Sequence, residues 1–425
     1  MARHQGRVVF VRHALPGEVV LARLTDAGEQ RRFWRADAVE VLTPSPDRVE
    51  PRCPVAGPGG CGGCDWQHAD LAAQRRGKAA VVAELLQRLG GVDPGTAAQV
   101  VVEPVPGDEQ GLGWRTRVRF AVDGEGRVGF RRHRSHEVVP VRGCPIAHPR
   151  INELGVPRWR WPGTAAVEVV APAGGTDRLV VVEPVGRRGD VDVPALDGVT
   201  ATARRDPDGL RRLRGRGWVE ESVLVDGRPV PFRVTGSGFW QVHPGAAKVL
   251  LDAVLAAADP RPGERAIDLY SGVGLFAAGL AERVGPTGQV IAVEADRRAV
   301  GDARRSLHDR PQVRLEHGTV QAMLRRLGGT PGAPGTGPAA DVVVLDPPRA
   351  GAGRVVIEQI AGLRPRVVVY VACDPAALAR DVAIARAAGY RLAGLRAFDA
   401  FPMTHHVECV ATLLPDGEPA LERIS

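Results

Sequence analysis

Residues 266–274 read AIDLYSGVG, which places an acidic residue at the end of an apolar strand, followed by a glycine turn and the helical stretch LFAAGLAERV. Five further predicted strands follow, separated by helical stretches: QVIAVEAD, VRLEHG, DVVVLDPP, VVVYVACD and RLAGLRAFD. A last strand reads HVECVATLL. Strands that alternate with helices indicate a mostly parallel sheet with helices on both faces. We therefore expect a doubly wound, Rossmann-like α/β domain over residues 236–425.

The chain before residue 236 predicts two smaller β units. Residues 1–50 carry short strands such as GRVVFV and FWRADAVEVL, which indicate a small OB-like β-barrel, truncated at its N-terminus, with no strand before GRVVFV. Residues 51–235 hold a cysteine-rich loop at 51–68, a linking helix at 70–90 and alternating strands such as TRVRFAVD and DRLVVVEPV. These strands predict a central antiparallel β domain that carries the loop.

Composition places the chain among globular proteins of several domains. Of its 425 residues, 44% are apolar and 25% are charged. The apolar runs stay well short of the roughly 20 residues that cross a bilayer, so we expect a cytoplasmic protein without a membrane partner. The net charge of +7 suits a polyanion such as RNA, but only Lys78 and Lys248 are lysines. Such an arginine bias has a compositional explanation as well, so charge alone leaves the partner open.

The six cysteines fall into groups that differ in their surroundings. One lies next to Glu408 in HHVECVATLL, and we expect this residue, Cys409, to fill core space, because neighbours in a strand point to opposite faces. Another, Cys373, ends a predicted strand. The remaining four occur in CPVAGPGGCGGC and RGCPIA and are Cys53, Cys61, Cys64 and Cys144. Four thiolates can bind a [4Fe-4S] cluster or a structural zinc ion, and the spacing does not separate the two.

Cys373 lies in YVACDPAALARD, where a strand ends and an Asp-Pro pair opens a helix. Because the helix dipole favours a thiolate at its N-terminus, we expect the pKa of this thiol to lie below the usual value of about 8.5. Asp346, in LDPPRAG, ends another predicted strand at the same edge, where such sheets bind ligands. Taken singly, each residue also fits a purely structural role: the cysteine could fill space in the core, and the aspartate could cap a turn.

Glu294 ends the second strand of this domain, about 20 residues after the glycine turn, where a carboxylate can accept ribose hydroxyls. The turn, with Gly272 and Gly274, lacks the GxGxxG dinucleotide fingerprint. Its absence disfavours a dinucleotide-dependent iron–sulfur oxidoreductase. Together the two segments resemble the cofactor site of class I S-adenosylmethionine methyltransferases.

Three motifs follow in order at the tips of successive strands: DPPRAG at 346–351, CDPAALARD at 373–381 and FPMTHHVE at 401–408. With GFWQVHP at 238–244, they resemble the RNA 5-methyluridine (uracil-C5) methyltransferase family. CGGCDWQH with a remote fourth cysteine is similar to the iron–sulfur branch of that family, and the small N-terminal unit is similar to its TRAM domain. The resemblance implies a monomeric enzyme that methylates uridine C5 in RNA, with 23S rRNA as the first candidate and tRNA as the alternative.

The resemblance also implies roles for individual residues. Cys373 would add to C6 of uracil and form a covalent adduct, and Glu408 would remove the C5 proton. The residues that fall on S-adenosylmethionine positions are Gln241, Tyr270, Glu294, Thr319 and Asp346. The four cysteines of the loop and of RGCPIA would hold a [4Fe-4S] cluster. An RNA-binding protein that has lost catalysis is the alternative of another class, and the intact Cys373, Asp346 and Glu408 argue against it.

Overall fold

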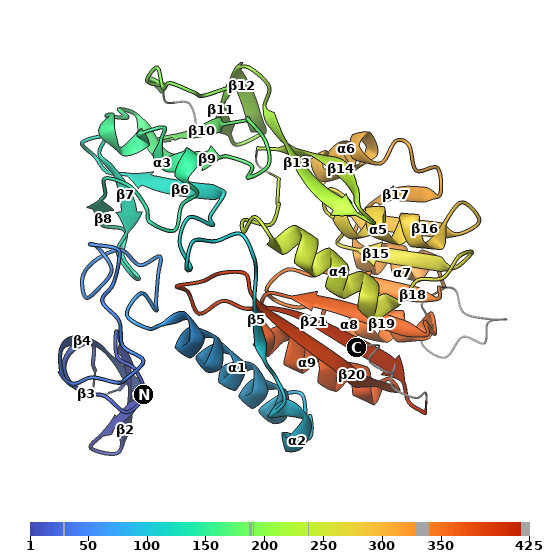
Figure 1. Ribbon diagram of the computed structural model, residues 1–425, viewed down its shortest axis with the longest axis horizontal. Helices are drawn as coiled ribbons and strands as arrows, with labels where there is room; N and C mark the ends of the chain where they lie inside the picture. The colour runs from blue at the N-terminus through green and yellow to red at the C-terminus, as the bar shows by residue number, and fades with distance from the viewer. Residues whose placement is uncertain (29, 187–188, 190, 237, 329–339, 418–425) are drawn as a thin grey trace.

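The computed structural model describes residues 1–28, 30–186, 189, 191–236, 238–328 and 340–417. Within these residues the strands form four sheets, and Figure 1 shows the large C-terminal sheet with helices on both sides, away from the small N-terminal unit. Every helix of the described part is too short or too polar to span a bilayer.

The largest sheet has eight strands in the order β17-β16-β15-β18-β19-β21-β20-β5. Strands β15 to β19 run parallel, and β21 lies antiparallel between β19 and β20. The strands are β5 (Val102–Pro104), β15 (Arg265–Leu269), β16 (Gln289–Glu294), β17 (Val313–His317), β18 (Val342–Leu345), β19 (Val367–Ala372), β20 (Tyr390–Asp399) and β21 (Glu408–Pro415). The strand order reverses between β15 and β18, which is where doubly wound sheets bind ligands, so the α/β prediction is confirmed.

Alternation of side chains along the strands builds an apolar core on each face of this sheet. On β15, for example, Ala266 packs into one core, and Ile267 and Leu269 pack into the other. The first core is covered by α4 (Ala246–Ala258) and α5 (Leu275–Val284), and α6 (Arg297–Ser306) lies beyond them. The second core is covered by α1 (Leu71–Arg88), α7 (Val320–Arg326), α8 (Gly353–Gly362) and α9 (Pro375–Ala387).

The central sheet has seven strands in the order β12-β11-β10-β9-β6-β7-β8. They are β6 (Arg117–Val122), β7 (Val128–Arg131), β8 (Val138–Pro140), β9 (Thr164–Val170), β10 (Leu179–Pro184), β11 (Ala201–Asp206) and β12 (Gly209–Arg214). The prediction of a wholly antiparallel sheet is wrong at one pair, because β10 and β11 run parallel. The connection between Pro184 and Ala201 is long enough to return to the starting edge, whereas a tight hairpin would have forced antiparallel pairing.

Two segments that precede residue 236 pack with the C-terminal sheet. Strand β5 pairs with the edge strand β20. The hairpin of β13 (Trp218–Val225) and β14 (Arg228–Thr235) contributes Phe232 to the core below α4 and α5. The backbone of β14 donates to Ser306 Oγ and Asp302 Oδ2 at the end of α6, at 3.0 and 2.8 Å.

The N-terminal unit is a curled four-stranded sheet in the order β1-β2-β4-β3. Its strands are β1 (Ala2–His4), β2 (Arg7–Arg12), β3 (Val19–Asp26) and β4 (Phe33–Thr43). The expectation that no strand precedes GRVVFV is wrong, because β1 pairs with β2. Gln5 and Gly6 both have positive φ, 47° and 77°, and such a two-residue turn joins antiparallel strands even when the first is very short.

Helix α1 lies inside the predicted range 70–90 and begins after Asp70, whose side chain accepts a hydrogen bond from Ala73 N at 2.8 Å. Its buried residues are spaced by four and share one face: Gln74, Lys78, Val82 and Leu86. Two polar side chains therefore lie on the face that packs against the protein.

Candidate active site

The turn after β15 has the backbone geometry of a ligand-binding loop. Tyr270, Gly272 and Gly274 have φ of 62°, 54° and 92°. A Cβ on Gly274 would lie 2.7 Å from Leu307 Cδ1, so that position needs glycine, whereas a Cβ on Gly272 would meet no atom within 4 Å. The open space beside Gly272 leaves room for a bound molecule to approach the backbone.

Glu294, at the end of β16, faces this turn. Its carboxylate accepts hydrogen bonds from Gly272 N at 2.9 Å and from Asp296 N at 2.6 Å. The two bonds hold the side chain at the carboxyl edge of the sheet while further acceptor positions stay open. Asp268, earlier on β15, is fully buried and accepts from Ala277 N at 2.9 Å, and burial raises its pKa well above the usual range.

The other predicted cofactor residues lie in the segments around the same edge. Thr319 follows β17 and caps α7, with its hydroxyl accepting from Ala322 N at 3.4 Å. Asp346 directly follows β18. Gln241 is buried before α4, close in sequence to His243, which is 1% exposed and whose Nε2 lies 3.6 Å from Asp108 Oδ2. The sequence did not predict this contact between a buried histidine and a partly buried aspartate.

The structure brings the predicted nucleophile and base together through strand pairing. Ala372, the last residue of β19, pairs with Cys409 on the antiparallel strand β21. One step further along this register, the partly buried Cys373 lies opposite Glu408, which is buried. Cys409 itself is fully buried in the core under α8 and α9, so its predicted role as core filling is confirmed.

The expected low pKa of Cys373 is wrong. Burial, followed by the charges of Glu408 and Asp346, raises the pKa of this thiol to about 11, and the Arg349 guanidinium opposes the rise. The helix dipole is therefore outweighed by desolvation and by two nearby carboxylates. The raised pKa favours the thiol form of Cys373, and the charge of Arg349 favours the thiolate.

The two carboxylates beside Cys373 are held in an environment that favours their protonated forms. Burial raises the pKa of Asp346 to about 7. Burial and the charge of Asp346 raise the pKa of Glu408 well above its usual range, against the opposing charge of Arg349. A carboxylate with a raised pKa is a stronger base once it is ionised, so Glu408 is suited to accept a proton from a bound molecule.

The raised pKa of Asp346 makes stability depend on pH. An unfolded aspartate ionises near pH 4, whereas the folded residue ionises at about 7. Between these values only the folded state holds the proton, so the free energy of unfolding falls as the pH rises through this window. Asp346→Asn removes this contribution and is expected to lose less stability than the wild type between pH 5 and pH 8.

Urea unfolding of the two proteins at both pH values checks this expectation. Asp309→Asn is the matched control, since its side chain is 60% exposed. An equal loss of stability in the wild type and in Asp346→Asn would contradict the raised pKa.

The four remaining cysteines line one cavity of about 180 Å³ together with Arg115 and Gln67. Among the described residues, no three His, Cys, Asp or Glu side chains are already set to hold a metal ion in common. Arg115 is partly buried beside them, and the charges of Cys144 and Cys64 favour its charged form against desolvation.

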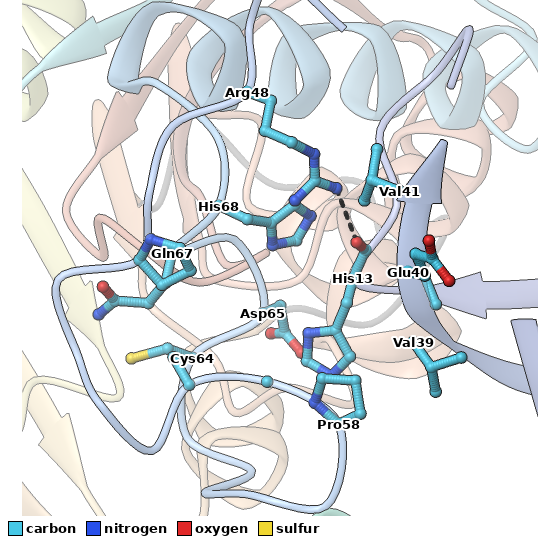
Figure 2. A pocket seen from close by; sticks show the side chains of 14 residues that line it. His13, Val39, Glu40, Val41, Arg48, Pro58, Cys64, Asp65, Gln67 and His68 are labelled. Carbon is cyan, nitrogen blue, oxygen red and sulfur yellow. Dashed lines mark hydrogen bonds between the residues drawn. The ribbon is translucent and has the colours of Figure 1, made fainter. Parts of the chain in front are cut away.

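A second cavity, also about 180 Å³, separates the N-terminal sheet from the cysteine-rich loop, and Figure 2 shows its lining. Arg48 Nη2 donates to the carbonyl of His13 at 2.8 Å and also pairs with the buried Glu18 carboxylate, whose pKa falls to about 2. His68 is 5% exposed and lines the same cavity. Since Cys64 lines both cavities, the loop lies between the N-terminal sheet and the central sheet.

Comparisons with known proteins show what the chain is similar to. The family described as tRNA (uracil-5-)-methyltransferase matches residues 336–415. An uncharacterized RNA methyltransferase of Streptomyces avermitilis is 51% identical over 419 residues, covering 97% of this chain and 94% of that protein. The 23S rRNA (uracil(1939)-C(5))-methyltransferase of Pectobacterium atrosepticum is 32% identical over 437 residues, covering 98% of this chain and 91% of the relative.

A solved structure has the same fold. The tRNA (uracil-54, C5)-methyltransferase of Pyrococcus abyssi, in complex with S-adenosyl-L-homocysteine, aligns with a TM-score of 0.70 at 22% identity, over 96% of this chain and 95% of that one. The two near-full-length relatives carry the assignment, because both exceed 30% identity. The chain therefore belongs to the family of S-adenosylmethionine-dependent RNA uracil-C5 methyltransferases.

Proposed function

We propose that the protein methylates C5 of a uridine in 23S rRNA through a covalent adduct on Cys373. The observation that carries this proposal is the meeting of Cys373, Glu408 and Asp346 at the sheet edge that also holds the glycine turn. The relative named as a 23S rRNA enzyme, alignable over nearly the whole chain, favours rRNA over tRNA. An rRNA substrate also favours a cytoplasmic location.

The chemistry assigns each side chain one step. C5 of uracil is a weak nucleophile, so Cys373 first releases its thiol proton to solvent, and the thiolate then adds to C6, forming a C–S bond and moving the electron pair into an enolate. S-adenosylmethionine supplies the methyl group that C5 then takes up. Glu408 accepts the C5 proton, the C5–C6 double bond re-forms and the C6–S bond breaks, which returns the thiolate. Arg349 favours this thiolate, since its charge lowers the pKa of Cys373.

The residues around the glycine turn fit the cofactor. Glu294 would accept the ribose hydroxyls, since its carboxylate is held by backbone N–H groups at the turn. The open space beside Gly272 supports close approach of the ligand to the backbone. We propose that the other contacts come from Gln241, Tyr270, Thr319 and Asp346.

We further propose that the four cysteines hold a [4Fe-4S] cluster. The four thiols line one cavity, which supports a shared site, and the similarity of CGGCDWQH to the iron–sulfur branch of the family favours iron over zinc. Arg115 would offset part of the negative charge of four thiolates. The cluster would supply a structural crosslink between the loop at 51–68 and Cys144 of the central unit.

A three-part organisation accompanies this proposal. Residues 1–50 would form a TRAM-like unit that contacts RNA, 51–235 the central unit with the cluster loop, and 236–425 the methyltransferase domain. The curled sheet of β1 to β4, which carries the cation–π pairs of Arg7 on Trp34 and Arg35 on Phe33, supports an RNA contact at the N-terminal unit.

Metal analysis tests the cluster. Protein purified without oxygen is expected to contain about four iron atoms per chain with matching acid-labile sulfide. Cys64→Ser and Cys144→Ser are expected to lose most of the iron, whereas the control Cys373→Ala keeps it. Stoichiometric zinc without iron would contradict the assignment.

Methyl transfer to unmodified RNA tests the function. With labelled S-adenosylmethionine and separate transcripts of 23S rRNA and tRNA, label is expected in 5-methyluridine of the 23S rRNA. Label confined to tRNA would replace the proposed substrate with the alternative. RNA binding without label in either transcript would support the inactive RNA-binding protein.

A further inference from the structure

The segment from Ala400 to Val407 joins β20 to β21 and leads directly into Glu408. Its central residues are buried, and Met403 is 6% exposed with φ of 68°. A residue with a side chain rarely adopts this left-handed conformation, which persists only where the surroundings hold it. The contacts of Met403 therefore decide how the chain enters the strand of the proposed base.

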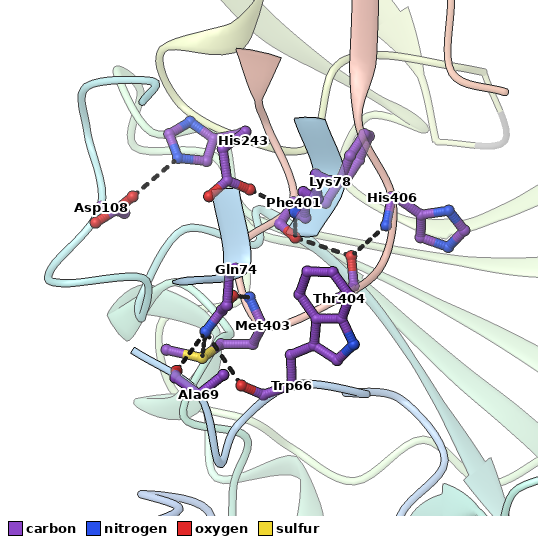
Figure 3. Close-up of polar contacts among 11 residues, drawn as sticks. Trp66, Ala69, Gln74, Lys78, Asp108, His243, Phe401, Met403, Thr404 and His406 are labelled. Atoms are coloured by element: carbon purple, nitrogen blue, oxygen red, sulfur yellow. Dashed lines mark hydrogen bonds and ion pairs between the residues drawn. The ribbon is translucent and has the colours of Figure 1, made fainter. Parts of the chain in front are cut away.

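Gln74 of α1 makes the closest of these contacts, as Figure 3 shows. Its Oε1 accepts from Met403 N at 2.8 Å, and its Nε2 donates to the carbonyls of Trp66 and Ala69 at 3.1 and 2.9 Å. The carbonyl of Met403 in turn accepts from Asp65 N and Trp66 N, each at 3.0 Å. One fully buried side chain thus links helix α1, the cysteine-rich loop and the segment before Glu408.

Lys78, one turn further along α1, fixes the start of the same segment. Its Nζ donates to Asp399 Oδ1 at 2.6 Å and to the carbonyl of Phe401 at 3.0 Å. The lysine and the aspartate are each 1% exposed. A buried pair of this kind is directional, because each unpaired charge would be costly in the interior.

Packing ties the same segment to the cysteines. Met403 lies in a small apolar cluster with Trp114 and Ile146, and Cys64 and Cys144 pack against this cluster. A Cβ on Gly111 would lie 2.9 Å from Met403 Cε, so the space around the methionine is filled. Movement of the cysteine-rich loop would therefore shift Met403 through these packing contacts.

We propose that Gln74 and Lys78 are positioning residues for proton removal by Glu408. Their hydrogen bonds to the segment before Glu408, together with those from the backbone of Asp65 and Trp66, are called the brace below. This inference rests on the proposed function. Cys373 follows β19 and is not part of the segment before Glu408 that Gln74 and Lys78 contact. Loosening the brace therefore slows the release of the RNA adduct and leaves its formation nearly intact.

Gln74→Met tests the brace, because methionine keeps the length of the side chain and removes its hydrogen bonds. Met403 N and Ala69 O lose their hydrogen bonds to this side chain, Trp66 O keeps only its bond from Ala69 N, and the segment relaxes. A base displaced by about 1 Å costs on the order of 100-fold in rate. We expect kcat to fall by about this factor with little change in KM for RNA, while an RNA adduct that resists denaturation accumulates on Cys373.

The control is Gln87→Met, an exposed glutamine on the same helix, which is expected to behave as the wild type. Gln74→Glu keeps an acceptor for Met403 N and is expected to lose less activity; it replaces the methionine variant if that variant does not fold. In a Glu408→Gln background, Gln74→Met is expected to add little to the slow release of the adduct, since both changes act on one step.

Two results would overturn the inference. The first is turnover of a folded Gln74 variant within about twofold of the wild type, because a misplaced base should cost far more than that. The second is a large loss of activity without accumulation of the RNA adduct. Glu408→Gln separates this inference from the proposed function. If Glu408→Gln accumulates adduct and the Gln74 variants do not, only the positioning role fails. If Glu408→Gln turns over freely without adduct, the assignment of Glu408 as the base fails and the positioning role fails with it, whereas loss of methyl transfer to RNA in the wild type would be the failure of the proposed function.

Discussion

Replacement of Cys373 by alanine is expected to lower methyl transfer to RNA by at least about 10⁴-fold, the scale on which loss of a covalent nucleophile acts. Without the thiolate, C6 of uracil gains no substituent and C5 does not become an enolate carbon, so the methyl group has no reactive acceptor. Single-turnover labelling of 23S rRNA measures the loss. Binding of S-adenosylmethionine should stay unchanged, because the cofactor contacts proposed here do not include the thiol.

Cys409→Ala is the matched control for this experiment. Cys409 is one residue from Glu408 but lies fully buried in the core under α8 and α9. Its replacement should lower stability and leave methyl transfer in the folded protein intact. Substantial label in 5-methyluridine with Cys373→Ala would show that the reaction proceeds without the proposed adduct.

The Glu408→Gln variant is expected to trap the adduct and to lower turnover by about 10² to 10⁴-fold, the range of a lost general base. Glutamine fills the space of the glutamate but cannot take the C5 proton, so the C6–S bond does not break. A denaturing gel should show protein that carries RNA. The double variant Cys373→Ala/Glu408→Gln should show none, and free turnover by Glu408→Gln would assign proton removal to another group.

The direction of the pH dependence follows from the same carboxylate. Burial and Asp346 raise the pKa of Glu408, so the ionised base becomes scarcer as the pH falls through this raised value. Release of the adduct is therefore expected to slow on the acidic side in the wild type. In Glu408→Gln the slow release should lose this dependence.

Much of the fold was predictable because the C-terminal half alternates strands and helices of clear period. The prediction of helix 70–90 was also confirmed, since Asp70 caps the helix and apolar residues recur along it. The errors arose where few residues carry the signal. Strand β1 has three residues and depends on the turn at Gln5 and Gly6, and β5 finds its partner β20 almost 300 residues later.

The sequence motifs predicted which residues form the site, but they did not predict the burial and the nearby charges that set the pKa of Cys373. Motif order placed Cys373 and Asp346 at one sheet edge, whereas the register of Ala372 with Cys409 sets Cys373 opposite Glu408. The sequence shows the helix that follows the thiol, and this alone predicts a low pKa. Burial and the two carboxylates, which reverse the direction, arise only from tertiary packing.

Gln74 and Lys78 were missed for a related reason. Apolar positions recur along this helix, and polar residues within such a pattern usually face solvent. Their partners Met403 and Asp399 lie 329 and 321 residues away, so no local signal identifies them. One hint was present, since Lys78 is one of only two lysines in the chain.

RNA that carries 5-fluorouridine at the target position tests the covalent mechanism most directly. After addition and methyl transfer, C5 bears fluorine in place of the proton that Glu408 would remove, so the enzyme should remain bound to the RNA. Peptide mass spectrometry of the denatured complex is predicted to find one methylated fluorouridine nucleotide attached to Cys373. Unmodified Cys373 in enzyme that actively forms 5-methyluridine on ordinary RNA, or attachment at another cysteine, would contradict the account.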